Sequence, residues 1–267
     1  MSKFKFGFIG CGNMGGALAT AAAKTLSVGS LAVCDMDAGK TAKIAQNTGA
    51  IVSSAKEIAE NSDYIFLAVK PQGLASLFEE IAPTLRGRKD RFVLVSMAAG
   101  TAIARIRELV GQDLPVIRIM PNTPVLVGEG MIVYTAENVT DGEIDGFLSG
   151  LVCAGRFDRI PERLIDAAGA LSGCGPAFVY LFAEALADGG VECGLPREQA
   201  LLYAAQTLEG AAKMLLETHA HPAALKDAVC SPGGTTIAGV HSLENSAFRG
   251  AVMGAVKAAF DKTAKLK

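Results

Sequence analysis

Tryptophan is absent from this sequence of 267 residues, aromatic residues make up only 6% and charged residues only 19%, while half of the residues are apolar. So little charge with so much apolar content excludes a disordered chain and predicts a large core, with a buried subunit interface in addition. The net charge is −2 and the 25 basic residues are dispersed. Nucleic acid is therefore not an expected partner.

The sequence also lacks any C-x-x-C pair among its six cysteines. We therefore expect a reduced cytoplasmic protein, with no cysteines spaced to bind a metal. His219 and His221 could suggest a metal site, but we assign them to a surface loop, so no metal is expected. The uncharged stretch 6–23 superficially resembles a secretory signal. It contains five glycines and Asn13, however, and it fits a strand, a turn and a helix better, so we expect neither export nor membrane insertion.

Apolar strand-like runs alternate with helical stretches through the first 160 residues, which predicts a mainly parallel, doubly wound sheet covered on both faces. The expected strands are 4–9, 31–34, 49–53, 63–69, 91–96, 115–120, 131–135 and 155–160. The expected helices are 14–26, 38–47, 55–61, 73–81, 101–110 and one that opens at Thr140 with a capping box to Glu143.

From Pro161 onward only helices are expected, at 164–171, 176–193, 196–218, 222–229, 235–243 and 247–265. The predicted domains are therefore a Rossmann-type α/β sheet domain, 1–160, and an all-helical domain, 161–267. The helical part is too apolar for a lone small bundle, so we expect it to form a homodimer with a second copy of itself.

A glycine-rich turn follows the first expected strand and opens the first expected helix. Gly10 permits the tight turn, Gly12 allows a pyrophosphate to approach the backbone, and Gly15 allows close packing of helix and strand. The helix N-terminus would neutralise the phosphates. This predicts a dinucleotide site that comprises Ile9, Gly10, Cys11, Gly12, Asn13, Met14 and Gly15.

Asp35 stands twenty residues beyond Gly15, at the end of the second expected strand. A carboxylate at this position suits the ribose hydroxyls of NAD and repels the extra phosphate of NADP. Alternatively, Asp35 or Asp37 caps the following helix. The sequence favours acceptance of NADH without excluding NADPH.

Three further strand ends should meet at the same edge of a parallel sheet, where ligands bind. Lys70 could stabilise a phosphate or a substrate carboxylate, or it is simply a solvated loop lysine. The residues expected at this edge are Ala68, Val69, Lys70 and Pro71 after one strand, Met97, Ala98 and Ala99 after the next, and Asn122 with Thr123 after the third.

Several segments resemble the pyrroline-5-carboxylate reductase family, and the match runs nearly end to end in the family's order. In the second half these are Ser231-Pro-Gly-Gly-Thr-Thr236, Leu171-Ser-Gly-Cys-Gly-Pro-Ala177 and Ala187-Asp-Gly-Gly-Val191. In the first half they are Phe8-Ile-Gly-Cys-Gly-Asn-Met-Gly15, Ala68-Val-Lys-Pro71 and Met120-Pro-Asn-Thr-Pro124. The resemblance implies NAD(P)H-dependent reduction of 1-pyrroline-5-carboxylate to L-proline, the last step of proline biosynthesis.

The resemblance also assigns roles to single residues. It implies cofactor contacts at 9–14, 68–71 and 97–99, and it places the Glu162 carboxylate near the cofactor and the dimer partner. It further implies a dimer through the helical domain, a larger ring of dimers, and a substrate loop that meets the cofactor across the interface. The substrate residues it implies are Gly234, Thr235 and Thr236, with Val229 as an apolar wall.

The chemistry of this loop agrees with that role. Consecutive amides after Gly233 suit a carboxylate, and the Thr236 hydroxyl could bond a ring nitrogen. Hydride transfer to an imine can be accelerated largely by positioning the imine carbon close to the hydride donor, so a strong general acid is not required. Thr236 and Lys70 are the expected catalytic residues. Two departures from the family pattern are Cys174, where serine is usual, and Asp35, where a small hydroxyl or basic residue holds a 2′-phosphate.

Two other functions remain open on the residues alone. One is a β-hydroxyacid or imine dehydrogenase that relies on a lysine of the helical part, for which Lys213 and Lys226 are candidates. The other is a dinucleotide-sensing module without catalysis. The intact Ser-Pro-Gly-Gly-Thr-Thr segment argues against the sensor, which has no need of it.

Overall fold

The structure is a computed structural model that describes residues 4–265. Its internal contacts divide the chain into two units. One unit runs up to Cys174 and includes the segment from Ala259 onward, and the other comprises Gly175–Ala258.

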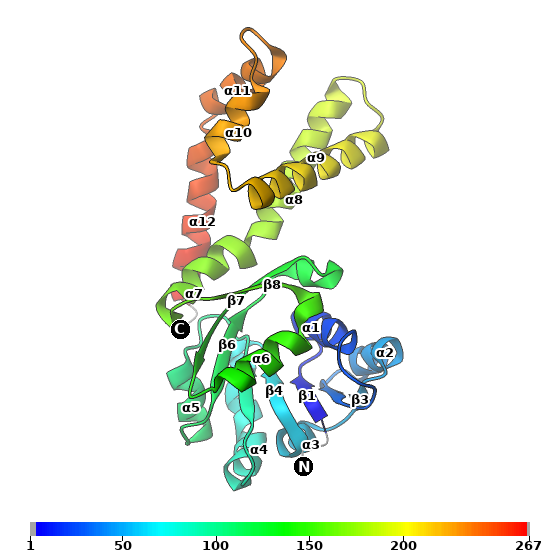
Figure 1. The fold of residues 1–267 in the computed structure, drawn as a ribbon, viewed down its shortest axis with the longest axis vertical. Coiled ribbons are helices and arrows are strands. Elements are labelled where there is room, and N and C mark those ends of the chain that lie inside the picture. Colours follow the sequence, from blue (N-terminus) through cyan, green and yellow to red (C-terminus); the bar gives the residue numbers. More distant parts are fainter. Residues whose placement is uncertain (1–3, 266–267) are drawn as a thin grey trace. The chain divides into compact units, whose positions relative to one another are not determined.

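The first unit contains an eight-stranded sheet in the order β3-β2-β1-β4-β5-β6-β7-β8 within the described residues (Figure 1). Neighbouring strands run parallel except β6 and β7, which are antiparallel. The strands are β1 (Phe4–Ile9), β2 (Leu31–Cys34), β3 (Ile51–Val52), β4 (Ser62–Leu67), β5 (Val93–Ser96), β6 (Val116–Met120), β7 (Gly130–Glu137) and β8 (Gly155–Arg159).

Helices cover both faces of this sheet, which confirms the predicted fold class (Figure 1). In β4, Phe66 faces one core and stacks on Phe8 with ring centroids 4.1 Å apart, whereas Ile65 and Leu67 face the other core. Burial on both faces explains why the strands show no polar alternation. The helices are α1 (Asn13–Ala23), α2 (Ala38–Thr48), α3 (Ala55–Asn61), α4 (Leu74–Gly87), α5 (Ile103–Val110) and α6 (Asp141–Gly150).

The direction of β7 follows from the length of its connection. Segment 121–129, which contains the short 3-10 helix η2 (Thr123–Val127), is shorter than the dozen or so residues that a parallel crossover needs. The longer connection from β7 to β8 contains α6 and restores parallel pairing. The predicted capping box of α6 is confirmed, because the Thr140 side chain accepts from Glu143 N and Glu143 accepts from Thr140 N.

The chain stays helical where the sequence predicts a break before Pro176. The α-helix α7 (Glu162–Ala168) leads into a π-helical segment, Gly169–Gly173, and then into α8 (Gly175–Glu192). Pro176 has no N–H for the carbonyl of Ser172, four residues earlier. The Asn122 side chain donates to that carbonyl at 3.0 Å instead, so the carbonyl keeps a partner.

The boundary predicted at residue 160 marks the end of the strands, but contacts within the chain assign α7 to the sheet unit. Two ion pairs also join this helix to the sheet, because Arg118 of β6 binds Glu162 and Asp166 of α7. How the chain divides into independently folding domains stays a prediction.

The second unit is helical. In the contact between α8 and α9, Ala187 and Ala200 are buried, and a Cβ built on Gly190 would meet the Ala200 side chain at 3.4 Å. Small side chains thus let these helices approach closely. Besides most of α8, the unit contains α9 (Arg197–Thr218), α10 (Pro222–Val229), α11 (Thr235–Asn245) and the larger part of α12 (Phe248–Ala264).

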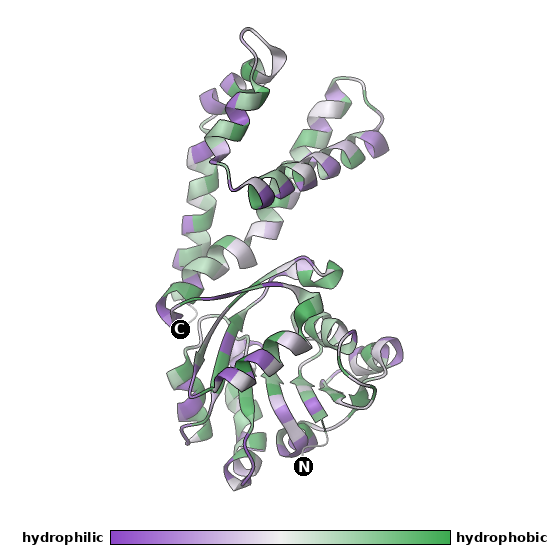
Figure 2. Cartoon of the chain, viewed as in Figure 1, coloured by the Kyte–Doolittle hydropathy of each residue, from purple (hydrophilic) through white to green (hydrophobic). Residues whose placement is uncertain are grey.

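Large apolar side chains are exposed to solvent on the helices of this unit. Leu181 is 68% and Met253 72% exposed, and Figure 2 shows apolar residues along much of α8 and α12. Phe178, Leu181 and Phe248 help to line an apolar groove on this unit. By length and composition, the helical stretch Glu162–Glu192 could also cross a membrane.

Candidate dinucleotide and substrate sites

The loop between β1 and α1 requires glycine at two positions. Gly10 adopts φ +107°, and a Cβ there would collide with the Ala68 carbonyl. A Cβ on Gly15 would collide with the Gly10 carbonyl and the Ala68 side chain. The loop therefore lies directly against the end of β4, as the predicted nucleotide motif requires.

Gly12 is the N-cap of α1, and a Cβ built on it meets no atom within 4 Å. Within the described residues, no side chain caps this helix and its first turn contains no acidic residue. The first-turn amides and the positive end of the helix dipole are thus left for an anion. These features fit a pyrophosphate, so the residues present suit the dinucleotide that the motif predicts.

Asp35 does not cap α2. Its carboxylate accepts from the backbone N–H of Cys11 at 2.6 Å and from that of Asp37 at 2.9 Å. The cap is Asp37, whose side chain accepts from Gly39 N at 2.9 Å. Asp35 therefore ties the glycine-rich loop to the end of β2 and places a negative charge beside that loop.

Cys11 is buried within the loop and is chemically inert. Burial raises the pKa of its thiol to about 12, and the nearby Asp35 carboxylate adds to the rise. The protonated thiol donates to the Cys34 carbonyl at 3.4 Å. At neutral pH this cysteine is neither a nucleophile nor a base.

Two backbone hydrogen bonds join the ends of β1, β4 and β5 at one edge of the sheet. The Ala68 N–H donates to Ile9 O at 2.8 Å, and the Met97 N–H donates to Leu67 O at 3.5 Å. The predicted residues after β1, β4 and β5 therefore lie side by side. Lys70, just beyond Ala68, is exposed.

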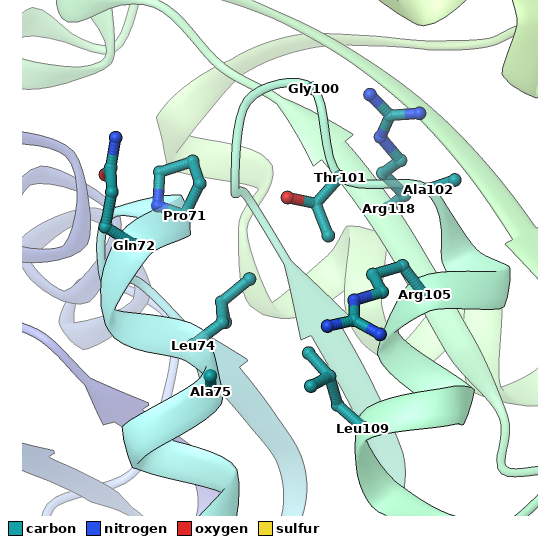
Figure 3. A pocket seen from close by; sticks show the side chains of 10 residues that line it. All are labelled: Pro71, Gln72, Leu74, Ala75, Gly100, Thr101, Ala102, Arg105, Leu109 and Arg118. Carbon is teal, nitrogen blue, oxygen red and sulfur yellow. The ribbon is translucent and has the colours of Figure 1, made fainter. Parts of the chain in front are cut away.

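A cavity of about 490 Å³ opens where the turns after β4 and β5 lead into α4 and α5 (Figure 3). Arg118 and Thr101 contribute polar groups to its wall, and Leu74 and Leu109 contribute apolar ones. The full lining comprises Pro71, Gln72, Leu74, Ala75, Gly100, Thr101, Ala102, Arg105, Leu109 and Arg118. The cavity thus adjoins two of the turns predicted to hold the cofactor.

The remaining two residues predicted for the cofactor have partners within the chain. Asn122 is buried, donates to Ser172 O and accepts from Met131 N at 2.9 Å, which accounts for both ends of its amide. Glu162 is partly exposed and accepts from Ile103 N at 2.8 Å.

The residues predicted to bind substrate lie in the helical unit, on the turn between α10 and α11. Gly233 adopts φ +68°, and Gly234 is the N-cap of α11, where a Cβ would collide with the Ser231 hydroxyl. Thr235 and Thr236 form the exposed first turn of α11. Val229, at the end of α10, is also exposed.

Comparison with known proteins adds to this geometry. A model described as "Pyrroline-5-carboxylate reductase dimerisation" matches residues 162–266, and one described as "NADP oxidoreductase coenzyme F420-dependent" matches 5–100. The Escherichia coli pyrroline-5-carboxylate reductase is 42% identical, and the match covers 98% of this chain and 98% of that protein. This chain belongs to the pyrroline-5-carboxylate reductase family.

Other relatives extend the match to plants and to solved structures. The Arabidopsis thaliana pyrroline-5-carboxylate reductase is 41% identical over 99% of this chain and 96% of its own. The crystal structure of Plasmodium falciparum pyrroline carboxylate reductase with NADP bound has a TM-score of 0.88 at 36% identity. That match covers 100% of this chain and 99% of the other, so the family resemblance extends to the whole fold.

Arg118 lies at this site but is not among the residues that the sequence predicts for it. Arg118 lines the cavity and binds both Glu162 and Asp166, yet we assigned it no role. The sequence offers one signal for it, a single arginine inside the apolar strand Val116–Met120. A buried charge requires partners, so such an arginine indicates a buried polar cluster.

The lysines considered for a dehydrogenase and the histidine considered for a metal site also have partners close by in the chain. Lys213 and Lys226 bind Glu209 and Asp227 on exposed helix surfaces, each at 2.6 Å. His221 caps α10 by accepting from Ala223 N. Among residues 4–265, His, Cys, Asp and Glu side chains form no group of three that could hold a metal ion.

Proposed function

We propose that this chain reduces 1-pyrroline-5-carboxylate to L-proline with NADH or NADPH, the last step of proline biosynthesis. The observation that carries the proposal is the full-length match to pyrroline-5-carboxylate reductases, on a chain whose glycine loop and strand ends suit a dinucleotide. When bound, the dinucleotide supplies a hydride from C4 of its nicotinamide ring.

In this proposal the glycine loop and the amides of α1 hold the pyrophosphate, and Asp35 faces the adenine ribose. The turns 68–71 and 97–99 form the wall against which the nicotinamide half lies. Lys70 is exposed at this edge and stabilises a phosphate or the substrate carboxylate. Asp35 favours NADH by repelling a 2′-phosphate, and both cofactors are accepted.

The substrate is bound by the turn between α10 and α11. The amides that begin α11 hold the carboxylate, the Thr236 hydroxyl bonds the ring nitrogen, and Val229 contacts the apolar ring edge. The imine carbon accepts the hydride while the C=N electron pair moves to nitrogen, which already carries a proton. The product is the secondary amine of proline, and alignment by Thr236 supplies the main catalytic contribution.

The exposed apolar helices support a homodimer through the helical domain, since a monomer would leave these side chains in water. The apolar stretch Glu162–Glu192 is thereby covered by a partner subunit and not by lipid. We further propose a ring of dimers, a cytoplasmic location, and active sites that combine the cofactor loop of one subunit with the substrate turn of another.

Steady-state oxidation of NADH and of NADPH, each with 1-pyrroline-5-carboxylate, tests the reaction on the purified protein. We expect oxidation that depends on the imine and forms one L-proline per dinucleotide consumed. A folded protein that binds dinucleotide but leaves the imine unchanged would refute the proposal. Oxidation of a hydroxyacid by the same protein would then favour the dehydrogenase alternative.

A further inference from the structure

Arg118 is a buried cation on strand β6. Its side chain is 4% exposed and donates to Glu162 Oε1 at 3.2 Å and to Asp166 Oδ1 at 2.6 Å. Its Nε has no hydrogen-bond partner within the described residues. A buried guanidinium with an unsatisfied N–H costs free energy, and a buried ion pair is weak evidence of a stabilising role.

Glu162 makes a second contact with the same oxygen, which accepts the backbone N–H of Ile103 at 2.8 Å. Ile103 is the first residue of α5, and its N-cap, Ala102, supplies no side-chain cap. A carboxylate at this end of a helix satisfies a free amide and interacts favourably with the helix dipole. Glu162 therefore caps α5 from another helix, and Arg118 holds Glu162 in the capping position.

The segment 97–102 is a turn that leads directly into α5. Gly100 in this segment adopts φ +72°, and Thr101 N donates to Ala98 O at 3.3 Å. Figure 3 shows the Arg118 side chain beside the stretch that carries Thr101 and Ala102. Hydrogen bonds thus lead from Arg118 through Glu162 to Ile103, and the backbone continues from there to the turn after β5.

We propose that Arg118 is a positioning residue for the nicotinamide half of the cofactor. It orients the Glu162 carboxylate, which caps α5 and keeps the turn 97–102 in the conformation that receives the ring. This inference rests on the proposed function, because the role of that turn as the nicotinamide wall belongs to it. Arg118 itself touches neither reactant in this account.

The test compares two ligands by calorimetric titration of the full-length protein. NADH carries the nicotinamide ring, whereas ADP-ribose keeps the adenosine, the pyrophosphate and the second ribose and lacks only that ring. We expect Arg118→Met to weaken NADH binding five- to twentyfold and to change ADP-ribose binding less than twofold. Equal weakening of both ligands, or no weakening of either, would overturn the inference and assign Arg118 a purely structural role.

Further variants test the path through Glu162. Glu162→Ala should reproduce the loss of NADH affinity, and the double variant Arg118→Met/Glu162→Ala should be no weaker than either single one. If the losses of NADH affinity in the two single variants multiply in the double variant, Arg118 does not act through Glu162. Glu162→Gln keeps an oxygen for Ile103 N and should lose less than threefold.

Asp166→Asn is the matched control, because it alters the other contact of the same guanidinium and leaves the link to Ile103 intact. We expect a lower melting temperature and an unchanged ratio of the two affinities. If Arg118→Met does not fold, Arg118→Lys keeps the charge but has one donor nitrogen in place of three, and it should give a smaller loss with the same selectivity for NADH. Because only binding is measured, a wild type that binds NADH but fails to reduce the imine refutes the proposed reaction alone.

Discussion

Replacing Asp35 with asparagine removes one negative charge from the end of β2 and hardly changes the size of the side chain. The carboxylate accepts two backbone N–H groups, from Cys11 at 2.6 Å and from Asp37 at 2.9 Å. An amide offers one oxygen to these two donors, so one charge-assisted hydrogen bond is lost. Such a bond contributes roughly 1.5–3 kcal/mol, and since the site is half-buried we expect the free energy of unfolding to fall by about 1–2 kcal/mol.

The same change alters the electrostatics toward a 2′-phosphate. At a contact distance of about 4 Å, each pair of unit charges repels by about 1 kcal/mol in bulk water and by more near a protein surface. Removing the carboxylate therefore relieves about 1–2 kcal/mol against NADPH, with no equivalent relief for NADH. Since 1.4 kcal/mol is a factor of ten, we expect the ratio of kcat/KM for NADPH to that for NADH to rise about 5- to 30-fold.

Steady-state kinetics with both cofactors and a thermal melt measure the two effects separately. The melt should show a decrease of about 2–8 °C, from roughly 2–4 °C per kcal/mol for a domain of this size. Asp37→Asn is the matched control, because it also removes one charge but leaves a residue that caps α2 equally well. An unchanged cofactor ratio in a stably folded Asp35→Asn protein would show that Asp35 only ties the glycine loop to β2.

Two further predictions concern the helical unit. Thr236→Ala should lower kcat/KM for 1-pyrroline-5-carboxylate about 10- to 100-fold through loss of one hydrogen bond to the ring nitrogen, with NADH binding unchanged by titration. Thr236→Ser, which keeps the hydroxyl, should retain most activity; equal losses in both variants would argue against the hydrogen bond. Leu181→Glu places a charge on the apolar groove and should give monomers in light scattering, while Lys213→Gln, on an exposed polar surface, should not. A persistent Leu181→Glu dimer would show that this groove is not the interface.

Local patterns predicted the elements of this fold well. The nucleotide loop, the capping box of α6 and the apolar runs of the central strands depend on residues within a few positions of one another. The helix before Pro176 was more difficult, because the missing N–H predicts a break. The chain stays helical through a π-helical segment, and Asn122, fifty residues away in sequence, donates to the Ser172 carbonyl that Pro176 leaves without a partner.

The choice between Asp35 and Asp37 as the cap of α2 also depended on a residue distant in sequence. Both precede α2 closely enough to cap it, and sequence spacing left the choice open. Only the approach of the glycine loop decided it, because Cys11 N comes within hydrogen-bond distance of Asp35 and leaves Asp37 as the cap.

The sequence by itself determined the family, the fold class and the positions of the glycine loop and the Ser-Pro-Gly-Gly-Thr-Thr turn, because these depend on local chemistry at close spacing. The tertiary structure alone decided that α7 joins the sheet unit and that Glu162 connects Arg118 to the start of α5. The physical reason is that buried charges and amides are satisfied by partners distant in the chain. Arg118 and Glu162 are 44 positions apart, and no local pattern predicts which of the chain's carboxylates will meet a given arginine.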